Sequence, residues 1–326
     1  MDIVCIGEVL IDFISSNPGR GLAEVTSLEK FAGGAPANVA IGLAKLGIKV
    51  AFAGRVGDDP FGAFLMQYLN DRKVDTTFLK KDAQHKTRLA FVCLDASGER
   101  TFEFWEKEPA DSAIEIGDFP EELRDNIKIV HFGSLALSAE KSRKAFEQIS
   151  AHFENSTTLI SFDPNYRKSL WRSDAEARTA LCSFGSQAHI FKLAAEEALF
   201  LTKAVKLESA AQKLFNKKTK LVAITLGAQG CYLKTRRFHT VVPGFNVKTV
   251  DTTGCGDAFT AALLAKIIKT GLDIEGYTPE MLSDLGRYAN AAGALVAGRR
   301  SGTASFPTDQ EIIALTIQNQ EKTEKG

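Results

Sequence analysis

Short, continuously apolar runs alternate along this chain with longer stretches whose apolar residues recur at helical spacing. A strand buried on both faces is typically such an unbroken run, whereas an amphipathic helix shows the longer period. The repetition of strand then helix predicts an α/β fold with a parallel sheet covered by helices on both faces. The expected strands are 3–6, 50–53, 129–132, 159–162, 189–192 and 221–225. The expected helices are 37–46, 61–71, 139–153, 174–184, 196–202, 258–269 and 279–297.

One region departs from this alternation and predicts a β-hairpin. Its expected arms are residues 88–94 and 99–105, joined by a turn of Asp, Ala, Ser and Gly. In the second arm Phe102 and Phe104 alternate with Glu103, as in a strand with one apolar face. On the residues alone, the hairpin is either an ordinary antiparallel edge of the main sheet or part of a separate small sheet.

The composition fits a globular protein that binds neither nucleic acid nor a membrane surface. The chain has 326 residues, 44% hydrophobic and 25% charged, with a formal net charge of +0. This leaves ample core for one large domain or two. No basic run or aromatic-interleaved basic patch occurs, so neither nucleic acid nor a membrane surface is an expected partner. No signal peptide is expected, and the longest apolar helix, near 258–268, is too short to span a bilayer.

The cysteines and histidines show no metal-ligand or disulfide pattern. The five cysteines are scattered and form no C-x-x-C pair: Cys5, Cys93, Cys182, Cys231 and Cys255. This indicates a reducing cytoplasm and argues against a disulfide framework or a zinc site. The polar residues that follow Ile317 predict a loose, solvated tail.

The most informative motif is a glycine-containing turn at 251–257. Residues 247–250 resemble the end of a strand, and a buried helix is expected from Ala258. Glycines leave backbone N–H groups uncovered, and a helix N-terminus adds unpaired donors and a positive dipole end, so the turn suits a phosphate. A carboxylate beside a phosphate makes sense if Asp257 takes a proton from a hydroxyl that attacks the phosphorus.

Other interpretations of this turn stay open on the residues alone. It is compatible with an acid-capped helix after a glycine turn, and with a reactive Cys255 thiol at a helix N-terminus. A dinucleotide fingerprint would need a third glycine where Phe259 stands. Neither the P-loop nor the protein-kinase motifs occur, so a nucleotide site would be of another type.

Residues 251–257, DTTGCGD, resemble the C-terminal signature of the ribokinase/pfkB family of sugar kinases. Residues 31–40 and 52–62 resemble its N-terminal signature, so the resemblance spans nearly the whole chain. It implies one kinase domain over 1–326 with the three-layer ribokinase-like fold, a central and mostly parallel sheet covered by helices. It also implies a small β-sheet lid, which would cover the sugar or pair with a second subunit as a homodimer. The lid would be formed by segments inserted at about 9–31 and 86–110.

The resemblance also assigns roles at the site. Asp257 would be the general base, and the turn of Gly254, Cys255 and Gly256 would form the anion hole for the transferred phosphate. The implied sugar-binding residues are Asp12, Gly33, Gly34, Asn38, Arg88, Phe104, Arg167 and Asp257. The implied ATP-binding residues are Asn165, Lys192, Thr225, Gly227, Gly230 and Asn290.

Two cations are implied as well. Glu197 would hold Mg²⁺ through water, since Mg²⁺ keeps several waters and takes few protein carboxylates. A potassium ion would order the anion-binding turn from behind. Its ligands, largely backbone carbonyls, would come from Asp251, Thr253, Val296, Arg299, Ser301 and Ser305.

The motifs favour a neutral sugar. Residues 33–38 have the fructokinase-like form, and 162–171 resemble both fructokinases and 2-keto-3-deoxygluconate kinases. Related lids often carry an Arg, which Arg88 would replace. The second hairpin arm instead carries the acids Glu103, Glu106 and Glu108, which would repel a sugar acid at short range. We therefore expect ATP-dependent conversion of fructose to fructose 6-phosphate. The alternatives are a 2-keto-3-deoxygluconate kinase or another sugar kinase of the family, and a non-catalytic sugar- or nucleotide-binding relative.

Overall fold

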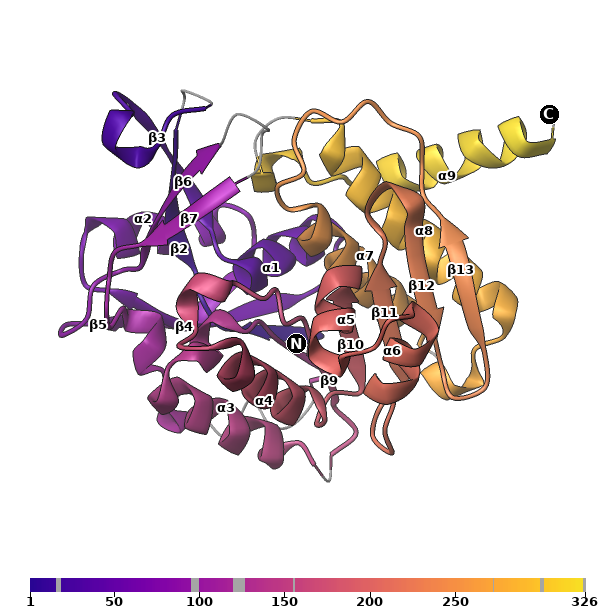
Figure 1. Cartoon of the computed structure of the whole chain (residues 1–326), viewed down its shortest axis with the longest axis horizontal. Coiled ribbons are helices and arrows are strands. Elements are labelled where there is room, and N and C mark those ends of the chain that lie inside the picture. The colour runs from indigo at the N-terminus through magenta and orange to yellow at the C-terminus, as the bar shows by residue number, and fades with distance from the viewer. Residues whose placement is uncertain are drawn as a thin grey trace.

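A computed structural model describes residues 1–15, 19–94, 100–119, 127–154, 156–271, 273–299 and 302–324. Within these ranges the chain builds a nine-stranded sheet in the order β13-β12-β11-β10-β9-β8-β1-β4-β5 (Figure 1). The strands from β5 to β11 in this order pair in parallel, and β12 and β13 add an antiparallel edge. They are β1 (Ile3–Ile6), β4 (Val50–Gly57), β5 (Asp75–Asp82), β8 (Ile129–Phe132), β9 (Leu159–Phe162), β10 (Ile190–Ala194), β11 (Leu221–Thr225), β12 (Gly230–Lys234) and β13 (His239–Pro243).

Helices cover both faces of this sheet and give three layers. Along β1, Ile3 and Cys5 pack in one buried cluster while Val4 and Ile6 pack in the other, which is the period of two expected of a strand buried on both sides. The first cluster includes residues of α1 (Ala35–Lys45), α2 (Pro60–Asn70), α7 (Cys255–Thr270), α8 (Pro279–Ala297) and α9 (Asp309–Glu324). The second includes residues of α3 (Glu140–His152), α4 (Asp174–Gly185), α5 (Ala195–Thr202) and α6 (Leu207–Leu214).

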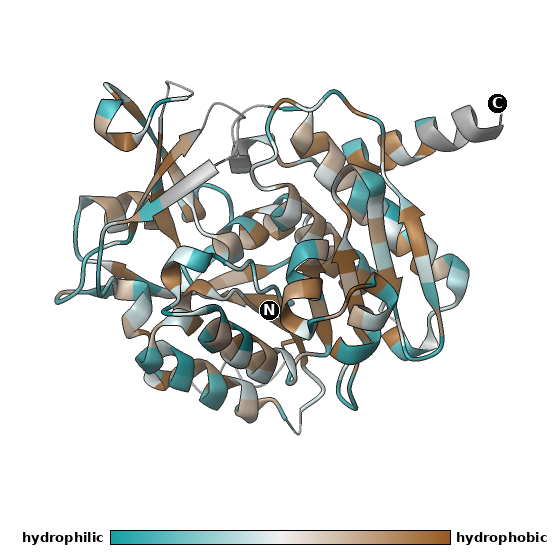
Figure 2. Cartoon of the chain, in the orientation of Figure 1, coloured by the Kyte–Doolittle hydropathy of each residue, from teal (hydrophilic) through white to brown (hydrophobic). Residues whose placement is uncertain are grey.

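The hydropathy of the residues follows these layers. The strands of the large sheet are mostly hydrophobic, whereas the helices in front of it carry hydrophilic residues on their outer sides (Figure 2). The three-layer α/β architecture predicted from the sequence is confirmed. Among the described helices, none combines the length and the apolar character needed to cross a bilayer.

A second, four-stranded sheet stands apart from the large one, with the order β3-β2-β6-β7 (Figure 1). It contains β2 (Leu10–Ser15), β3 (Leu28–Gly33), β6 (Leu89–Leu94) and β7 (Arg100–Phe104). The predicted hairpin is present as the antiparallel pair β6–β7, and its turn, 95–99, lies outside the described residues. β2 pairs with β6 in parallel and with β3 antiparallel, so the hairpin belongs to this small sheet rather than to an edge of the large one.

Several sequence-based boundaries were wrong. Residues 247–250 form no strand, since β13 ends at Pro243. They lie in a connecting segment in which Val250 is 54% exposed and no neighbouring strand provides hydrogen bonds for an extended conformation. The tail expected after Ile317 is instead the continuation of α9 to Glu324, because Gln, Glu and Lys are good helix formers. Strands β5, β12 and β13 and helices α6 and α9 were not predicted. Short 3₁₀ turns complete the description: Leu22–Glu24, Ala110–Ala113, Ile116–Asp118, Leu135–Ser138, Lys168–Leu170, Gly227–Gln229, Ile274–Gly276 and Gly302–Ser305.

Candidate active site

The glycine-containing turn leads directly into helix α7. Gly254 is the N-cap residue with φ of 78°, a left-handed conformation that favours glycine. The first i→i−4 bond of the helix runs from the Ala258 N–H to the Gly254 carbonyl at 2.8 Å, so the N–H groups of Gly256 and Asp257 precede the helical ladder. The Cys255 N–H donates to the Thr252 carbonyl at 3.3 Å. The turn therefore presents backbone donors and a positive helix end at one point, as expected of an anion site.

Two cavities meet at this turn. The first, of about 750 Å³, is lined by Asp12, Asn38, Arg167 and Asp257 among others. The second, of about 650 Å³, has the following among its lining residues: Thr225, Gly227, Gly230, Cys255 and Asn290. Thr252 and Gly256 line both. A group transferred between molecules in the two cavities would thus pass the helix N-terminus.

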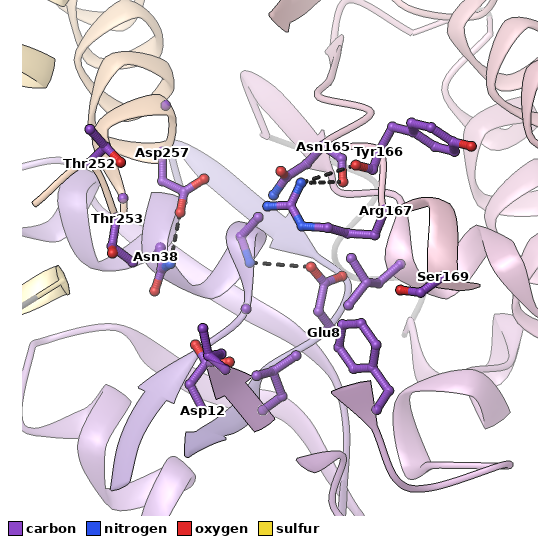
Figure 3. Close-up of a pocket in the computed structure, with 18 of the residues that line it drawn as sticks. Glu8, Asp12, Asn38, Asn165, Tyr166, Arg167, Ser169, Thr252, Thr253 and Asp257 are labelled. Atoms are coloured by element: carbon purple, nitrogen blue, oxygen red, sulfur yellow. Dashed lines mark hydrogen bonds between the residues drawn. The ribbon is translucent and has the colours of Figure 1, made fainter. Parts of the chain in front are cut away.

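Asp257 faces the first cavity and is tied to helix α1. Its Oδ2 accepts a hydrogen bond of 2.8 Å from the Asn38 side-chain amide (Figure 3). Desolvation raises the pKa of Asp257 to about 6; the Asn38 hydrogen bond acts in the opposite direction, and the negative charge of Asp163 adds to the rise. A carboxylate with a pKa in this range can accept a proton near neutral pH and pass it on afterwards.

The inner face of the small sheet forms one wall of this cavity. Leu10, Asp12 and Ile14 alternate along β2 and line it, together with Val92 of β6 and Phe104 of β7. This is the period of two expected when one face of a sheet covers a cavity.

The paired glycines before α1 are required by close packing. A Cβ at Gly33 would lie 2.1 Å from the Asp12 carboxylate oxygen Oδ2. Gly34 has φ of 104°, and a Cβ there would lie 2.5 Å from the backbone carbonyl oxygen of Glu8. Gly33 therefore lets β3 lie against β2, and Gly34 lets the start of α1 lie against the backbone of Glu8. This close packing brings Asp12 and Asn38 to the same cavity.

A buried ion pair lies under the glycine-containing turn. The Lys192 ammonium donates to Asp163 Oδ2 at 2.8 Å, with both side chains less than 8% exposed. A Cβ at Gly256 would lie 3.2 Å from Lys192 Nζ, so the ammonium sits directly beneath the turn. Burial opposes the charged form of Lys192, yet its pKa is raised because Asp163, Glu197 and Asp257 surround it with negative charge. Lys192 therefore carries a positive charge beside the expected phosphate position.

Arg167 and Asn165 lie on the opposite wall from Asp257. The guanidinium Nη1 of Arg167 donates to the Tyr166 carbonyl at 3.1 Å, and the side chain extends toward the centre of the cavity (Figure 3). Asn165 has φ of 38°, a conformation that Asn tolerates better than most residues. Both line the first cavity, as does Lys192. Asn165 and Lys192, which were assigned from the sequence to the nucleotide, thus line the first cavity and not the second.

Two expected ligands are engaged with the protein itself. Arg88 is 4% exposed and pairs with Asp111 at 2.8 Å, and it is not among the residues that line the first cavity. Glu197 accepts backbone N–H groups through both oxygens, from Tyr166 at 2.6 Å and from Ala194 at 2.7 Å. No group of three His, Cys, Asp or Glu side chains able to hold a metal occurs in the part of the chain that the structure describes. A magnesium ion would therefore depend on water and phosphate oxygens, with Glu197 as an outer partner.

The residues expected to hold potassium lie behind the turn. The Asp251 carboxylate accepts from the Thr253 N–H at 2.9 Å and from its hydroxyl at 2.6 Å. The Val250 N–H donates to the Ala297 carbonyl at 2.7 Å and thereby joins this loop to the end of α8, beside Val296. Arg299 Nη1 donates to the Ser305 carbonyl at 3.0 Å, so a guanidinium already faces that oxygen. Ser301 lies outside the described residues.

Among the residues of the first cavity that sequence reasoning did not name, Glu8 is a buried acid. It lies in the segment between β1 and β2, is 0% exposed and accepts from the Ala35 N–H at 3.2 Å through Oε1. The position of Glu8 in the sequence could have identified it. It is an acid that follows a buried strand, and open α/β sheets bind their ligands at the carboxyl ends of their strands.

The comparison with known protein families is decisive for the class of protein. The family model described as pfkB family carbohydrate kinase matches residues 1–309. The chain belongs to this family. Among curated relatives of this pfkB kinase, Fructokinase-1 of Zea mays is 40% identical over 314 residues, covering 96% of this chain and 97% of the relative.

Solved structures of similar proteins agree with this assignment. The fructokinase of Xylella fastidiosa with bound ATP superposes on this pfkB kinase with a TM-score of 0.89 at 30% identity, covering 98% of this chain and 99% of the other. A double mutant of the fructokinase from Vibrio cholerae O395, in a form with bound fructose, ADP and potassium ion, has a TM-score of 0.85 at 32% identity. It covers 97% of this chain and 98% of the other. The ribokinase-like fold and the phosphotransferase class predicted from the motifs are confirmed.

Proposed function

We propose that this pfkB kinase is an ATP-dependent fructokinase that converts fructose to fructose 6-phosphate. The observation that carries the proposal is the position of Asp257, which faces one cavity at the N-terminus of α7 while a second cavity opens on the other side of the same turn. Fructose would occupy the first cavity and ATP the second. The similarity to plant and bacterial fructokinases over nearly the whole chain supports the choice of sugar.

In this proposal Asp257 accepts the proton of the terminal primary hydroxyl of the sugar. The hydroxyl oxygen forms a bond to the γ-phosphorus of ATP, the bond from that phosphorus to the β–γ bridging oxygen breaks, and ADP leaves with the electron pair. The N–H groups of Gly256 and Asp257, the positive end of α7 and the Lys192 ammonium stabilise the negative charge on the transferred group. Asn38 orients the Asp257 carboxylate through its hydrogen bond of 2.8 Å.

The remaining parts of the site support the reacting groups. Asp12, Asn38 and Arg167 would bind sugar hydroxyls, and the small sheet would act as a lid that excludes water from them. Magnesium would neutralise charge on the phosphates, with Glu197 as its outer partner. Potassium would occupy the loop around Asp251, a proposal supported by the potassium-bound fructokinase of similar structure. The chain would act as one kinase domain in a reducing cytoplasm, with the outer face of the lid as the contact for a second subunit.

The charges around the cavity support a neutral sugar over a sugar acid. The carboxylates of Asp12 and Asp257 line it beside the cations Arg167, Lys168 and Lys192, and the Lys192 ammonium is already paired with Asp163. The lid acids Glu103, Glu106 and Glu108 line a neighbouring cavity that shares Phe104 with the first. A carboxylate on the substrate would be repelled at short range by Asp12, Asp257 and the lid acids. A 2-keto-3-deoxygluconate kinase is therefore the weaker alternative.

An ADP-release assay with the whole chain, ATP and Mg²⁺ tests the proposal. The panel is fructose, ribose, 2-keto-3-deoxygluconate and adenosine, each measured for kcat/KM. We expect the highest value for fructose and no turnover without Mg²⁺. A higher kcat/KM for 2-keto-3-deoxygluconate would refute the argument from charge, and binding without turnover of any sugar would identify a non-catalytic relative.

A further inference from the structure

Glu8 has no role in the mechanism above, yet its carboxyl group is buried against the cavity with one oxygen unused. Its side chain is 0% exposed, and Oε2 has no hydrogen-bond partner. Only Ser150 Oγ shares this condition among the buried side-chain polar atoms of the described residues, and Ser150 does not line the cavity. An orphaned buried carboxyl oxygen costs free energy of folding, so a partner that arrives later is a physical reason to keep it.

The direction of the side chain indicates where that partner would come from. Glu8 extends into the space enclosed by Asp12, Asn38, Arg167 and Asp257, the proposed sugar-binding residues (Figure 3). Its other oxygen is held by the Ala35 N–H at 3.2 Å, so the carboxyl cannot swing away. The group is therefore fixed in place before any ligand binds.

We propose that Glu8 is a sugar-binding residue whose neutral carboxyl group donates a hydrogen bond from Oε2 to a substrate hydroxyl. This inference rests on the proposed function of the cavity and adds a contact to it. Asp12 and Asp257 can only accept hydrogen bonds when ionised, whereas a sugar hydroxyl also needs a donor. A neutral acid supplies that donor without adding a charge to the cavity.

The surroundings of Glu8 keep it neutral at pH 7. Burial raises the pKa of Glu8 to about 8; the Asp111 carboxylate adds to the rise, while Arg88 and the N–H of Ala35 act against it. The other charged groups that line its cavity are Asp12, Arg167, Lys168, Lys192 and Asp257. Because the pKa is raised, the donor form is present below about pH 8 and is lost as the pH rises through that value.

Two variants separate sugar binding from a structural role. Glu8→Gln keeps the size, the acceptor for the Ala35 N–H and a donor toward the cavity; Glu8→Met keeps only the bulk. We expect Glu8→Gln to bind the sugar within about threefold of the wild type and Glu8→Met to bind it about tenfold more weakly, the size of one net hydrogen bond. Calorimetric titration of each whole-chain protein with sugar gives the dissociation constants, and a thermal melt confirms that each variant is folded.

A series of monodeoxy analogues of the sugar then identifies the contact. One analogue, which lacks the hydroxyl that Glu8 contacts, should bind the wild type about tenfold more weakly than the parent sugar does. Its affinity for Glu8→Met should be no lower than its affinity for the wild type, because the hydrogen bond is already missing when the hydroxyl is absent. Equal loss for the parent and every analogue in Glu8→Met would make Glu8 a structural residue and overturn the proposal.

The pH dependence supplies a second readout. Sugar binding by the wild type should weaken above about pH 8 and level off at about tenfold in total, the loss expected for Glu8→Met, and Glu8→Gln should show no such change. Tighter wild-type binding above that pH, or the same limb in both proteins, would overturn the donor assignment. These titrations use whichever neutral sugar the wild type phosphorylates fastest. If fructose is not a substrate, the proposed function is refuted, but the role of Glu8 can still be tested with the other sugar.

Discussion

Asn38 in helix α1 donates a hydrogen bond of 2.8 Å to the carboxylate of Asp257 in the first turn of α7, although 219 residues separate them in the sequence. The bond joins α1, the helix that follows β3, to α7, the helix that begins at the glycine-containing turn. The two sequence signatures are therefore two sides of one site, and the proposed general base is held by a residue from the other signature.

Substitution of the proposed base should separate chemistry from binding. Asp257→Asn should lower kcat for fructose by about 10²–10⁴-fold, the usual contribution of a positioned general base. The dissociation constant for fructose should change little, because the other side chains of the cavity are intact. Steady-state kinetics and calorimetric titration measure the two quantities. Parallel loss of rate and affinity would instead make Asp257 a binding or structural residue.

The activity should have an acidic limb set by Asp257. Its pKa is raised to about 6, chiefly by desolvation, so the unprotonated base is present above that value and is lost as the pH falls through it. We expect kcat/KM to fall about tenfold per pH unit below pH 6. Asn38→Ala removes the hydrogen bond that favours the charged form and should move this limb to higher pH. An unshifted limb in Asn38→Ala would assign the limb to another group.

The Cys255 side chain should be dispensable, although a bulky group on it should not be tolerated. Its Sγ lies 3.9 Å from the Asp251 carbonyl oxygen, and the residue lines the second cavity but not the first. Direct in-line transfer needs no covalent intermediate. Cys255→Ala should therefore keep at least about a third of kcat, since only packing is lost. A bulky thiol reagent should inactivate the wild type and spare the variant, and ATP should protect better than fructose. A folded but inactive Cys255→Ala protein would restore the hypothesis of a nucleophilic thiol.

The buried pair beneath the turn should matter for stability as well as rate. Asp163 is only 2% exposed, and its carboxylate pairs with the Lys192 ammonium. Lys192→Met removes this ammonium and leaves a buried carboxylate without its ion-pair partner. Removing one member of a buried pair costs about 3–5 kcal/mol of the free energy of unfolding. The double variant Asp163→Asn/Lys192→Met should recover part of this loss in chemical denaturation but should not recover kcat. Additive losses in stability would show that the two side chains do not interact.

A monovalent cation should stimulate the enzyme from behind the anion-binding turn. Asp251 and Thr253 form a compact loop that is fixed to the end of α8 by the backbone bonds to Ala297. Replacing sodium by potassium at constant ionic strength should raise kcat/KM, and Asp251→Ala should abolish the difference. Equal activity in the two salts would refute the potassium site.

The sequence predicted the parts of this molecule that depend on local patterns. Continuous apolar runs identified most strands of the large sheet, and Gly254, Gly256 and Asp257 identified the turn that begins α7; its role in anion binding stays a prediction. Strand β13 was missed because it is an edge strand, is partly exposed and carries a weaker apolar signal; Val241, for example, is 60% exposed. Strand β12 is buried between β11 and β13, so exposure does not explain why it was missed.

Residues whose roles depend on distant partners could not be predicted in the same way. Arg88 was expected to reach the sugar, but it is hydrogen-bonded to Asp111, which lies 23 positions later in the sequence. No local sequence pattern predicts this pairing. Glu8 was overlooked for the same reason: its burial follows from the contact between the segment after β1 and the start of α1. The chemistry of a motif is local, whereas the burial and the partners of a side chain are set by the whole fold.

The small sheet is made from two separate excursions of the chain, β2–β3 and β6–β7, and within the described residues their only mutual ladder is the parallel pair β2–β6. Two parallel strands cannot pair through a short turn, because a long connection must cross from the end of one strand to the start of the other. The connecting chain must therefore fold before the two strands can pair. Here that chain contains α1, β4, α2 and β5. The lid should therefore assemble after the body and open before it. Amide hydrogen exchange should be faster in β6 and β7 than in β1 and β8, and a polypeptide halted before β6 should not hold a sugar.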